Sequence, residues 1–264
     1  MITGFDHVII AVRDLGAGVA AYETLLERGV VQRFEREGAE IALIATDNIS
    51  VELMAPKGEG EAALRLRAAL EAGEGLKSLV FATRDLNGLH RRSERVGLAP
   101  EAIVEREDYA SFRFNTEHTN GVRLFALQRS APIAPATMRP AGVSALDHIV
   151  VRSANFDRAA ALFGARLGLD LRLDREAVGR RLMFFRCGDA IVEIAQFPDE
   201  QADSFWGLSW RVADAEAARE RLASAGVNVS EVRAGVKPGT RVFTVRDKSC
   251  GVPTLMIEAA KHAQ

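Results

Sequence analysis

One pattern in this sequence, present twice, constrains the fold more than any other feature. An Asp-His pair opens an apolar, β-branched run at residues 5–12 (FDHVIIAV) and again at residues 146–151 (LDHIVV). A short polar turn, an Ala-rich stretch with helical spacing and three strand-like runs follow each copy. Each copy therefore predicts a βαβββ module.

The spacing inside the pattern recurs as well. His7 precedes Glu52 by 45 residues, and His148 precedes Glu193 by 45 residues. Each glutamate lies in the last strand-like run of its module, in ISVEL and AIVEI. Because the residue types and the interval both repeat, we interpret the pattern as an internal repeat.

Two weaker copies complete the chain. SLVFATRD at residues 78–85 and GLSWRVAD at residues 207–214 resemble the first strand and its turn, and a helical stretch follows each. VNVSEVR, TRVFTVRD and PTLMIEA are expected to be the closing strands of the last copy. The sequence thus predicts four βαβββ modules, at about 1–57, 76–130, 144–198 and 205–260.

A linker-like segment separates the modules into two pairs and predicts two domains. Residues 131–143 (APIAPATMRPAGV) hold three prolines and show no apolar periodicity, as expected of a linker. An N-terminal domain of residues 1–130 and a C-terminal domain of residues 144–264 are each large enough to bury a core.

Composition excludes several classes of protein. Hydrophobic residues make up 48% and charged residues 27%, which excludes a disordered, collagen-like or coiled-coil chain. The net charge of -2 argues against nucleic acid as a partner, and no apolar run approaches the roughly 18 residues of a membrane span. Two cysteines without metal-like spacing, and no visible signal peptide, indicate a cytoplasmic protein.

Four modules with His on the first strand and Glu on the last resemble the vicinal oxygen chelate superfamily, which includes glyoxalase I, extradiol dioxygenases, methylmalonyl-CoA epimerase and bleomycin resistance proteins. The resemblance covers nearly the whole chain. It implies an α+β fold in which module pairs form two glyoxalase-like domains, each a curled, partly open mixed β-sheet barrel with outer helices. It also implies a concave sheet surface that binds a small molecule.

The resemblance implies a divalent metal held by His and Glu side chains from paired modules. His148 and Glu193 are the first candidate ligands, with Glu258 as third ligand and catalytic carboxylate. His7 and Glu52 form a second candidate site. Imidazole and carboxylate ligands suit Fe, Zn, Ni, Co or Mn. The same residues could instead be retained structural pairs, with each Glu bonded to an arginine.

The other two modules depart from the family pattern. Ser78 and Gly207 occupy the expected His positions, and Phe125 lies near one expected Glu position. In the fourth module, counting from Gly251 places Leu255 at the expected Glu position. Glu258, three residues later, would lie on the same face of the strand as Leu255 only if a bulge near Pro253 shifted the strand. Pairing of modules one and three would bring four ligands together, and the sequence leaves the pairing open.

Four further side chains are candidates for substrate contact. Arg241 lies in a basic hairpin and could bind an anionic oxygen, although the hairpin could equally be a solvated surface. Trp206, Trp210 and Phe185 could form an aromatic wall or belong to the core.

Two functions follow as hypotheses. The first is a metal-dependent lyase, isomerase or oxygenase acting on a small oxygenated molecule. The second is a metal-free small-molecule-binding protein of the bleomycin-resistance type, favoured by the incomplete ligand set. Either would work as a monomer or homodimer, with no nucleic-acid or membrane partner, and glutathione use stays open.

Overall fold

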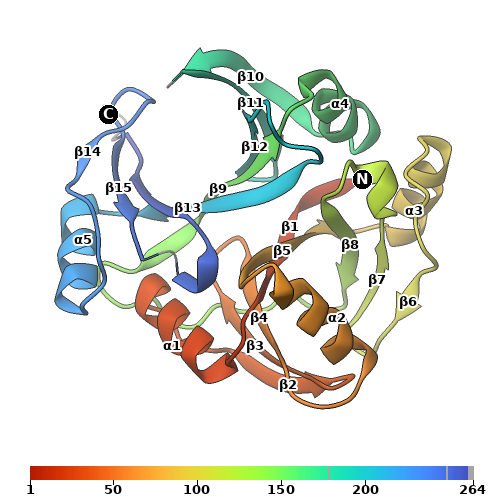
Figure 1. Cartoon of the computed structure of the whole chain (residues 1–264), viewed down its shortest axis with the longest axis horizontal. Coiled ribbons are helices and arrows are strands. Elements are labelled where there is room, and N and C mark those ends of the chain that lie inside the picture. Colours follow the sequence, from red (N-terminus) through yellow and green to blue (C-terminus); the bar gives the residue numbers. More distant parts are fainter. Residues whose placement is uncertain (178, 248, 261–264) are drawn as a thin grey trace. The chain divides into compact units, whose positions relative to one another are not determined.

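The first half of the chain folds into two βαβββ modules, as predicted (Figure 1). The computed structural model describes residues 1–177, 179–247 and 249–260. The first module contains β1 (Ile2–Ala11), α1 (Leu15–Leu26), β2 (Gln32–Arg36), β3 (Ala39–Ala45) and β4 (Ser50–Pro56). After α2 (Glu61–Glu71), the second contains β5 (Gly75–Thr83), α3 (Leu86–Arg95), β6 (Val104–Glu105), β7 (Tyr109–Arg113), the short 3-10 helix η1 (Thr116–Thr119) and β8 (Arg123–Arg129).

The second half repeats this order. The third module contains β9 (Val143–Ser153), α4 (Phe156–Ala160), the π-helical turn η2 (Ala161–Arg166), β10 (Asp170–Ala177), β11 (Arg180–Cys187) and β12 (Ala190–Gln196). The fourth contains β13 (Ser204–Val212), α5 (Ala215–Ser224), β14 (Arg233–Ala234), β15 (Arg241–Val245), η3 (Ser249–Gly251) and β16 (Thr254–Glu258). The strand expected over 227–233 is mostly irregular: a single bridge joins Val229 to Val245 before β14 begins.

Each module helix begins at a side-chain cap that the sequence supplies. Asp14, Asp85, Asn155 and Asp214 each accept a hydrogen bond from a backbone N–H two or three residues later. Such caps satisfy N–H groups that have no partner inside the helix. The turn after the first strand of each module therefore fixes where its helix starts.

The modules combine into two mixed, eight-stranded sheets, which confirms the predicted fold class. The strand order is β2-β3-β4-β1-β5-β8-β7-β6 in the first sheet and β10-β11-β12-β9-β13-β16-β15-β14 in the second. In modules two, three and four, the first and last strands are parallel neighbours: β5 with β8, β9 with β12 and β13 with β16. The hydrogen-bonded sheets thus pair module one with two and module three with four.

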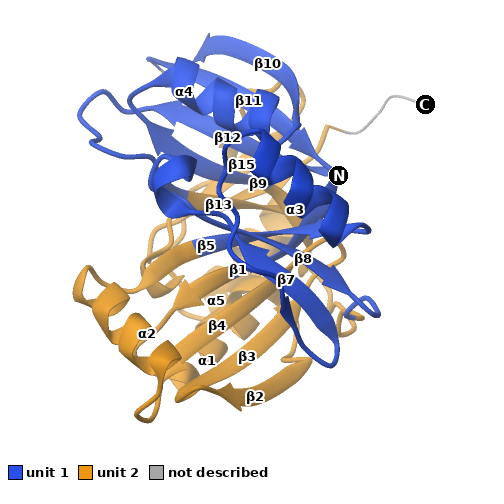
Figure 2. Ribbon diagram, turned by 90° about the vertical axis from the view of Figure 1, so that its right-hand side faces the viewer, with its two compact units in different colours: residues 1–8, 78–133, 148–206 blue, residues 9–77, 134–147, 207–264 orange. Residues whose placement is uncertain are grey.

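The chain also divides in another way, into two compact units whose residues lie close to one another in space (Figure 2). Unit 1 holds Met1–Val8, Ser78–Ile133 and His148–Trp206, and unit 2 holds Ile9–Lys77, Ala134–Asp147 and Gly207–Gln264. Each unit therefore takes segments from both halves of the sequence. The limits of the domains at 130 and 144 stay a prediction.

Each unit contains an arginine that binds the carbonyl end of a helix. In unit 1, Arg166 of η2 donates to the carbonyls of Val96 and Gly97 just after α3. In unit 2, Arg221 of α5 donates to the carbonyls of Thr24 and Leu25 at the end of α1. A cation at a helix C-terminus satisfies free carbonyls and complements the helix dipole.

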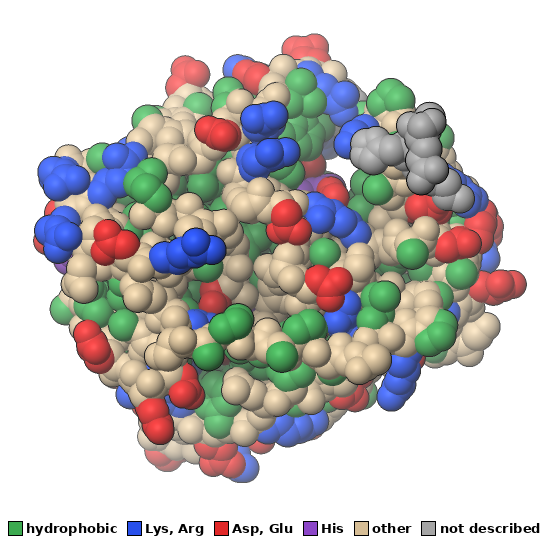
Figure 3. Space-filling model, turned by 180° about the vertical axis from the view of Figure 1, so that it is seen from behind, with side chains coloured by type: hydrophobic (Ala, Val, Ile, Leu, Met, Phe, Trp, Pro, Cys, Tyr) green, Lys and Arg blue, Asp and Glu red, His purple; other side chains and the backbone are tan. Residues whose placement is uncertain are grey.

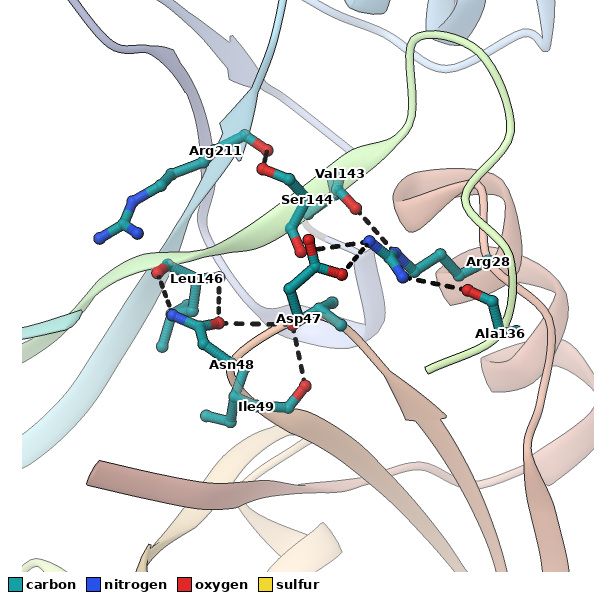
Figure 4. Close-up of polar contacts among 10 residues, drawn as sticks. Arg28, Asp47, Asn48, Ile49, Ala136, Val143, Ser144, Leu146 and Arg211 are labelled. Carbon is teal, nitrogen blue, oxygen red and sulfur yellow. Dashed lines mark hydrogen bonds and ion pairs between the residues drawn. The ribbon is translucent and has the colours of Figure 1, made fainter. Parts of the chain in front are cut away.

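The predicted linker is held down by one buried arginine of unit 2 (Figure 4). The Arg28 side chain is 2% exposed and pairs with Asp47 at 2.7 Å. It also donates to the carbonyls of Ala136, Val143 and Ser144. Because a buried guanidinium needs partners for its five N–H groups, these carbonyls are part of the packed structure.

Charges of both signs are mixed on one face of the molecule (Figure 3). On the face shown in Figure 3, Lys and Arg side chains alternate with Asp and Glu, in keeping with the net charge of -2. Among the described residues, no helix has the length and apolar character that crossing a membrane would require.

Candidate functional site

His148 and Glu193 meet in unit 1, on adjacent parallel strands. The register places Ile191 opposite His148 and Glu193 opposite Val150, so the two polar side chains point to the same face of the sheet. The Nε2 atom of His148 lies 3.4 Å from the Oε2 atom of Glu193, and each side chain is 15% exposed. An imidazole and a carboxylate are thus held together at a partly accessible position.

In the part of the chain that the structure describes, the helices of unit 1 that contact β9–β12 lie on the opposite face, so we call the face of the pair the helix-free face of β9–β12. The opposite face packs on α4 and η2, where the ring of Phe185 lies 6.0 Å from that of Phe163. Phe184 points the other way and stands directly opposite Glu193 in register. Phe184, rather than the expected Phe185, therefore shares the face of the His148–Glu193 pair.

A small apolar cluster forms the floor beside the pair. Val150, Leu182 and Ala195 are buried on the helix-free face, and the rings of Phe184, Phe197 and Trp206 pack against them. The expected Trp206 thus reaches this face, where its ring centroid lies 5.0 Å from that of Phe197 in an edge-to-face arrangement. A planar, partly apolar molecule would find matching surface here.

Three arginines lie among these rings, and sequence reasoning missed all of them. The guanidinium carbon of Arg152 lies 4.7 Å from the ring centroid of Phe197 and 4.9 Å from that of Trp206. Arg180 lies 4.3 Å from the centroid of Phe197, and Arg175 lies 5.9 Å from that of Phe184. The signal available in the sequence was alternation: Arg152 follows His148 by four residues on one strand and so shares its face.

Glu258, expected as third ligand and catalytic carboxylate, is bonded elsewhere in unit 2. Its Oε2 atom accepts a hydrogen bond from the N–H of Ala215 at the start of α5 (2.9 Å). Strand β16 pairs with β13 without a shift in register, so no bulge near Pro253 brings Glu258 to the face of Leu255. The carboxylate lies at the positive end of a helix, where it stabilises the helix dipole.

The other two expected contact residues also serve packing in unit 2. Arg241 pairs with Glu216 of α5 at 2.5 Å and lies 3.5 Å from Glu258. Trp210 is completely buried and belongs to the core. Arg241 is therefore paired with α5, and Trp210 is packed in the core of unit 2.

In the first half, His7 is buried against its own neighbour. The Nδ1 atom of His7 lies 2.6 Å from Asp6, and Arg129 donates two hydrogen bonds to the same carboxylate. Burial alone would raise the pKa of the Asp6 carboxyl, but the hydrogen bonds and charges of His7 and Arg129 outweigh burial and hold that pKa below its ordinary value. Asp6 is therefore a fixed anion in unit 1.

Glu52, the second candidate of the first half, lies in unit 2. Its side chain is 6% exposed, and Arg36 approaches it to 3.8 Å. A cation this close competes with a metal ion for the carboxylate.

The donor atoms around His148 and Glu193 determine what kind of metal site this face can form. Among the described residues, no group of three or more His, Cys, Asp or Glu side chains is placed to hold one ion. His148 and Glu193 supply two donors of the kind that divalent transition metals prefer. They suit an open site, in which water or a substrate would fill the remaining positions.

Comparison with known families identifies the fold. A model described as a glyoxalase-like domain matches residues 5–167, and a model of the glyoxalase, bleomycin resistance protein and dioxygenase superfamily matches residues 147–244. No curated protein matches the chain.

Solved structures of similar fold are 4-hydroxymandelate synthase from Streptomyces coelicolor, determined as a mutant, and the Mn(II)-bound glyoxalase from Novosphingobium aromaticivorans. The first has a TM-score of 0.73 at 13% identity, covering 100% of this chain and 95% of its own. The second has a TM-score of 0.71 at 17% identity, covering 98% and 83%. A catechol 2,3-dioxygenase has a TM-score of 0.71 at 14% identity, covering 100% and 90%. Since the first family model spans more than half of the 264 residues, the chain belongs to the glyoxalase-like domain family of the vicinal oxygen chelate superfamily.

Proposed function

We propose that the protein is an enzyme that acts on a small oxygenated molecule at the helix-free face of β9–β12, with a divalent metal ion bound by His148 and Glu193. The observation that carries this proposal is the 3.4 Å approach of His148 Nε2 to Glu193 Oε2 on a partly exposed sheet face. The Mn(II)-bound glyoxalase of similar fold supports a metal in this superfamily.

When bound, Fe, Zn, Ni, Co or Mn would supply Lewis-acid polarisation of vicinal substrate oxygens. The chain's own residues have separate tasks. His148 and Glu193 fix the position of the polar centre, while Val150, Leu182 and Ala195 keep water away from one side of it. Phe184, opposite Glu193 in register, offers an aromatic surface to the rest of the substrate. We assign Glu258 to the start of α5 and leave it out of the ligand set.

A second candidate function is metal-free binding of a small molecule. It is favoured by the donor count, because two converging protein ligands are fewer than the three typical of a catalytic metal site. In this case the same face would bind its ligand through the arginines and aromatic rings alone.

Metal content separates the two candidates. Elemental mass spectrometry on protein purified without chelator or affinity metal should find about one ion per chain if His148 and Glu193 form an open metal site. His148→Ala and Glu193→Gln should lose the ion, whereas His7→Ala and Glu258→Gln should keep it. Metal-free protein after reconstitution with Fe, Zn, Ni, Co and Mn would exclude the metalloenzyme and leave the binding protein. Loss only in His7→Ala would move the site to the first half.

A further inference from the structure

The arginines of the helix-free face have fewer carboxylate partners than their number requires. Arg152 pairs with Glu200 at 3.2 Å. Neither Arg175 nor Arg180 forms an ion pair with any carboxylate among the described residues. The Nε atoms of Arg152 and Arg175 are buried and have no hydrogen-bond partner among the residues that the structure describes. This face therefore carries positive charge that its own side chains leave uncompensated.

The register shows that these cations surround the apolar cluster. Arg175, Leu182, Ala195 and Arg152 form one row across the four strands. The next row on the same face, about 7 Å along the strands, contains Leu173, Phe184, Glu193 and Val150. Arg180 lies beyond the first row, opposite Ala177. An arginine thus stands at each end of a short apolar row, beside the row that carries Glu193.

Two of the cations share a single aromatic ring. Arg152 and Arg180 both lie within 5 Å of the Phe197 ring centroid, at 4.7 and 4.3 Å. These distances place the two guanidinium groups at most about 9 Å apart, so their charges repel each other, and stacking on a ring offsets only part of that cost. An anion placed between the two guanidinium groups would relieve the repulsion and could accept forked hydrogen bonds from either.

We propose that the helix-free face binds a planar aromatic carboxylate, with the carboxylate between Arg152 and Arg180 and the ring against Trp206 and Phe184. The assignment names the substrate class for the site proposed above and rests on that location. It depends on the arginines and rings, however, and on no metal ion. The oxygenated end of such a molecule would extend along the strands toward His148 and Glu193, which occupy the following rows.

The test uses isothermal titration calorimetry of the whole chain in excess EDTA and, separately, in Mn(II). The probes are 2-naphthoate, its uncharged analogue 2-naphthamide, and cyclohexanecarboxylate, which keeps the charge but lacks the planar ring. We expect 2-naphthoate to bind in both buffers, and each of the other two probes to bind at least about tenfold more weakly. Added KCl should weaken the binding of 2-naphthoate.

Neighbouring arginines on one strand provide a matched control. Arg180→Gln and Arg152→Gln should each weaken 2-naphthoate about tenfold, the loss expected when a charge-assisted hydrogen bond is removed. Arg181→Gln should stay within about twofold, because Arg181 points to the opposite face, where it stacks on Phe156 and pairs with Asp174. Metal content should be unchanged in all three variants.

Several results would overturn the assignment. These are equal binding of the amide and the acid, no binding of either, an equal loss in Arg181→Gln, or binding that disappears in EDTA. A protein that holds no metal but binds 2-naphthoate in EDTA through Arg180 would refute the metalloenzyme and keep this inference. A protein that binds metal at His148 but does not bind 2-naphthoate would keep the metalloenzyme proposal and refute this inference.

Discussion

The two Asp-His openings have nearly the same sequence and different surroundings. In the first, Asp6 is 10% exposed and Arg129, which donates two hydrogen bonds to it, is 16% exposed. In the second, Arg211 approaches Asp147 to 2.9 Å, and both side chains are 29% exposed. The histidines follow the same trend, at 7% for His7 and 15% for His148. A nearly identical strand motif is therefore largely buried in one half and partly exposed in the other, and the partly exposed copy is the better candidate site.

Breaking the ion pair of each opening should give the largest difference between them. Arg129→Gln is expected to lower the free energy of unfolding by about 3 kcal/mol, because it removes the guanidinium that donates two hydrogen bonds to a largely buried carboxylate. Arg211→Gln should cost less than about 1 kcal/mol, since its pair is more exposed. Equilibrium urea unfolding measures both values. Equal losses would show that the two openings differ in appearance only.

Replacing the histidines should give a smaller contrast. His7→Gln is expected to destabilise the protein by about 1–2 kcal/mol, since a buried hydrogen bond to Asp6 is disrupted. His148→Gln should change stability by about 0.5 kcal/mol or less, as a partly exposed residue retained for binding would. Urea unfolding in EDTA gives the comparison without any metal contribution. A larger loss in His148→Gln would assign the structural role to the second opening.

The smallest effect is expected in the pH dependence of stability. The pKa of Asp6 is lowered in the folded protein, so its contribution is present above the unfolded pKa, near 3.8, and disappears as pH falls through the folded value. Asp6→Asn should remove this contribution. The slope of the unfolding free energy against pH should then become less steep below about pH 4, by the equivalent of at most one bound proton.

Asp203 gives the opposite sign and serves as the control for Asp6. Burial raises the pKa of Asp203, against hydrogen bonds and charge from Ser153, Arg158 and Asn120. Its contribution is therefore full below the unfolded pKa and is lost as pH rises through the folded value. Asp203→Asn should remove this loss of stability with rising pH. The urea unfolding midpoints of the Asp6 and Asp203 variants between pH 2 and 7 measure the two pH dependences. Parallel shifts of the two variants would contradict these assignments.

The fold could be predicted because the information that fixes it is local. Alternating apolar runs mark the strands, and Asp14, Asp85 and Asp214 cap helices directly after them. The prediction failed over 227–233, where alternation in VNVSEVR suggested a strand. Only one bridge and the two-residue β14 form there, since pairing with β15 is a non-local property.

The candidate site was less predictable because it depends on register. The sequence placed His148 and Glu193 in one module, but the phenylalanine expected to accompany them was Phe185, and the register of β11 places Phe184 on their face instead. Glu258 had the right type and nearly the right position, yet the regular pairing of β16 directs it to α5. Arg175 and Arg180 come from strands where nothing local signals a shared face, and only the pairing of β10 with β11 brings them together.

The buried contact of Arg28 changes how the linker can be engineered. Surface connections rich in proline are ordinarily good places to insert residues, join genes or cut a chain. Here the carbonyls of Ala136, Val143 and Ser144 accept hydrogen bonds from the buried guanidinium of Arg28, which lies just after α1. A fragment that stops at residue 130 would leave that charge buried without these acceptors, and an insertion between 136 and 143 would pull them apart. Two halves expressed separately would therefore be poor stand-ins for the whole, and the segment that looks most expendable in the sequence is one that a designer should leave at its natural length.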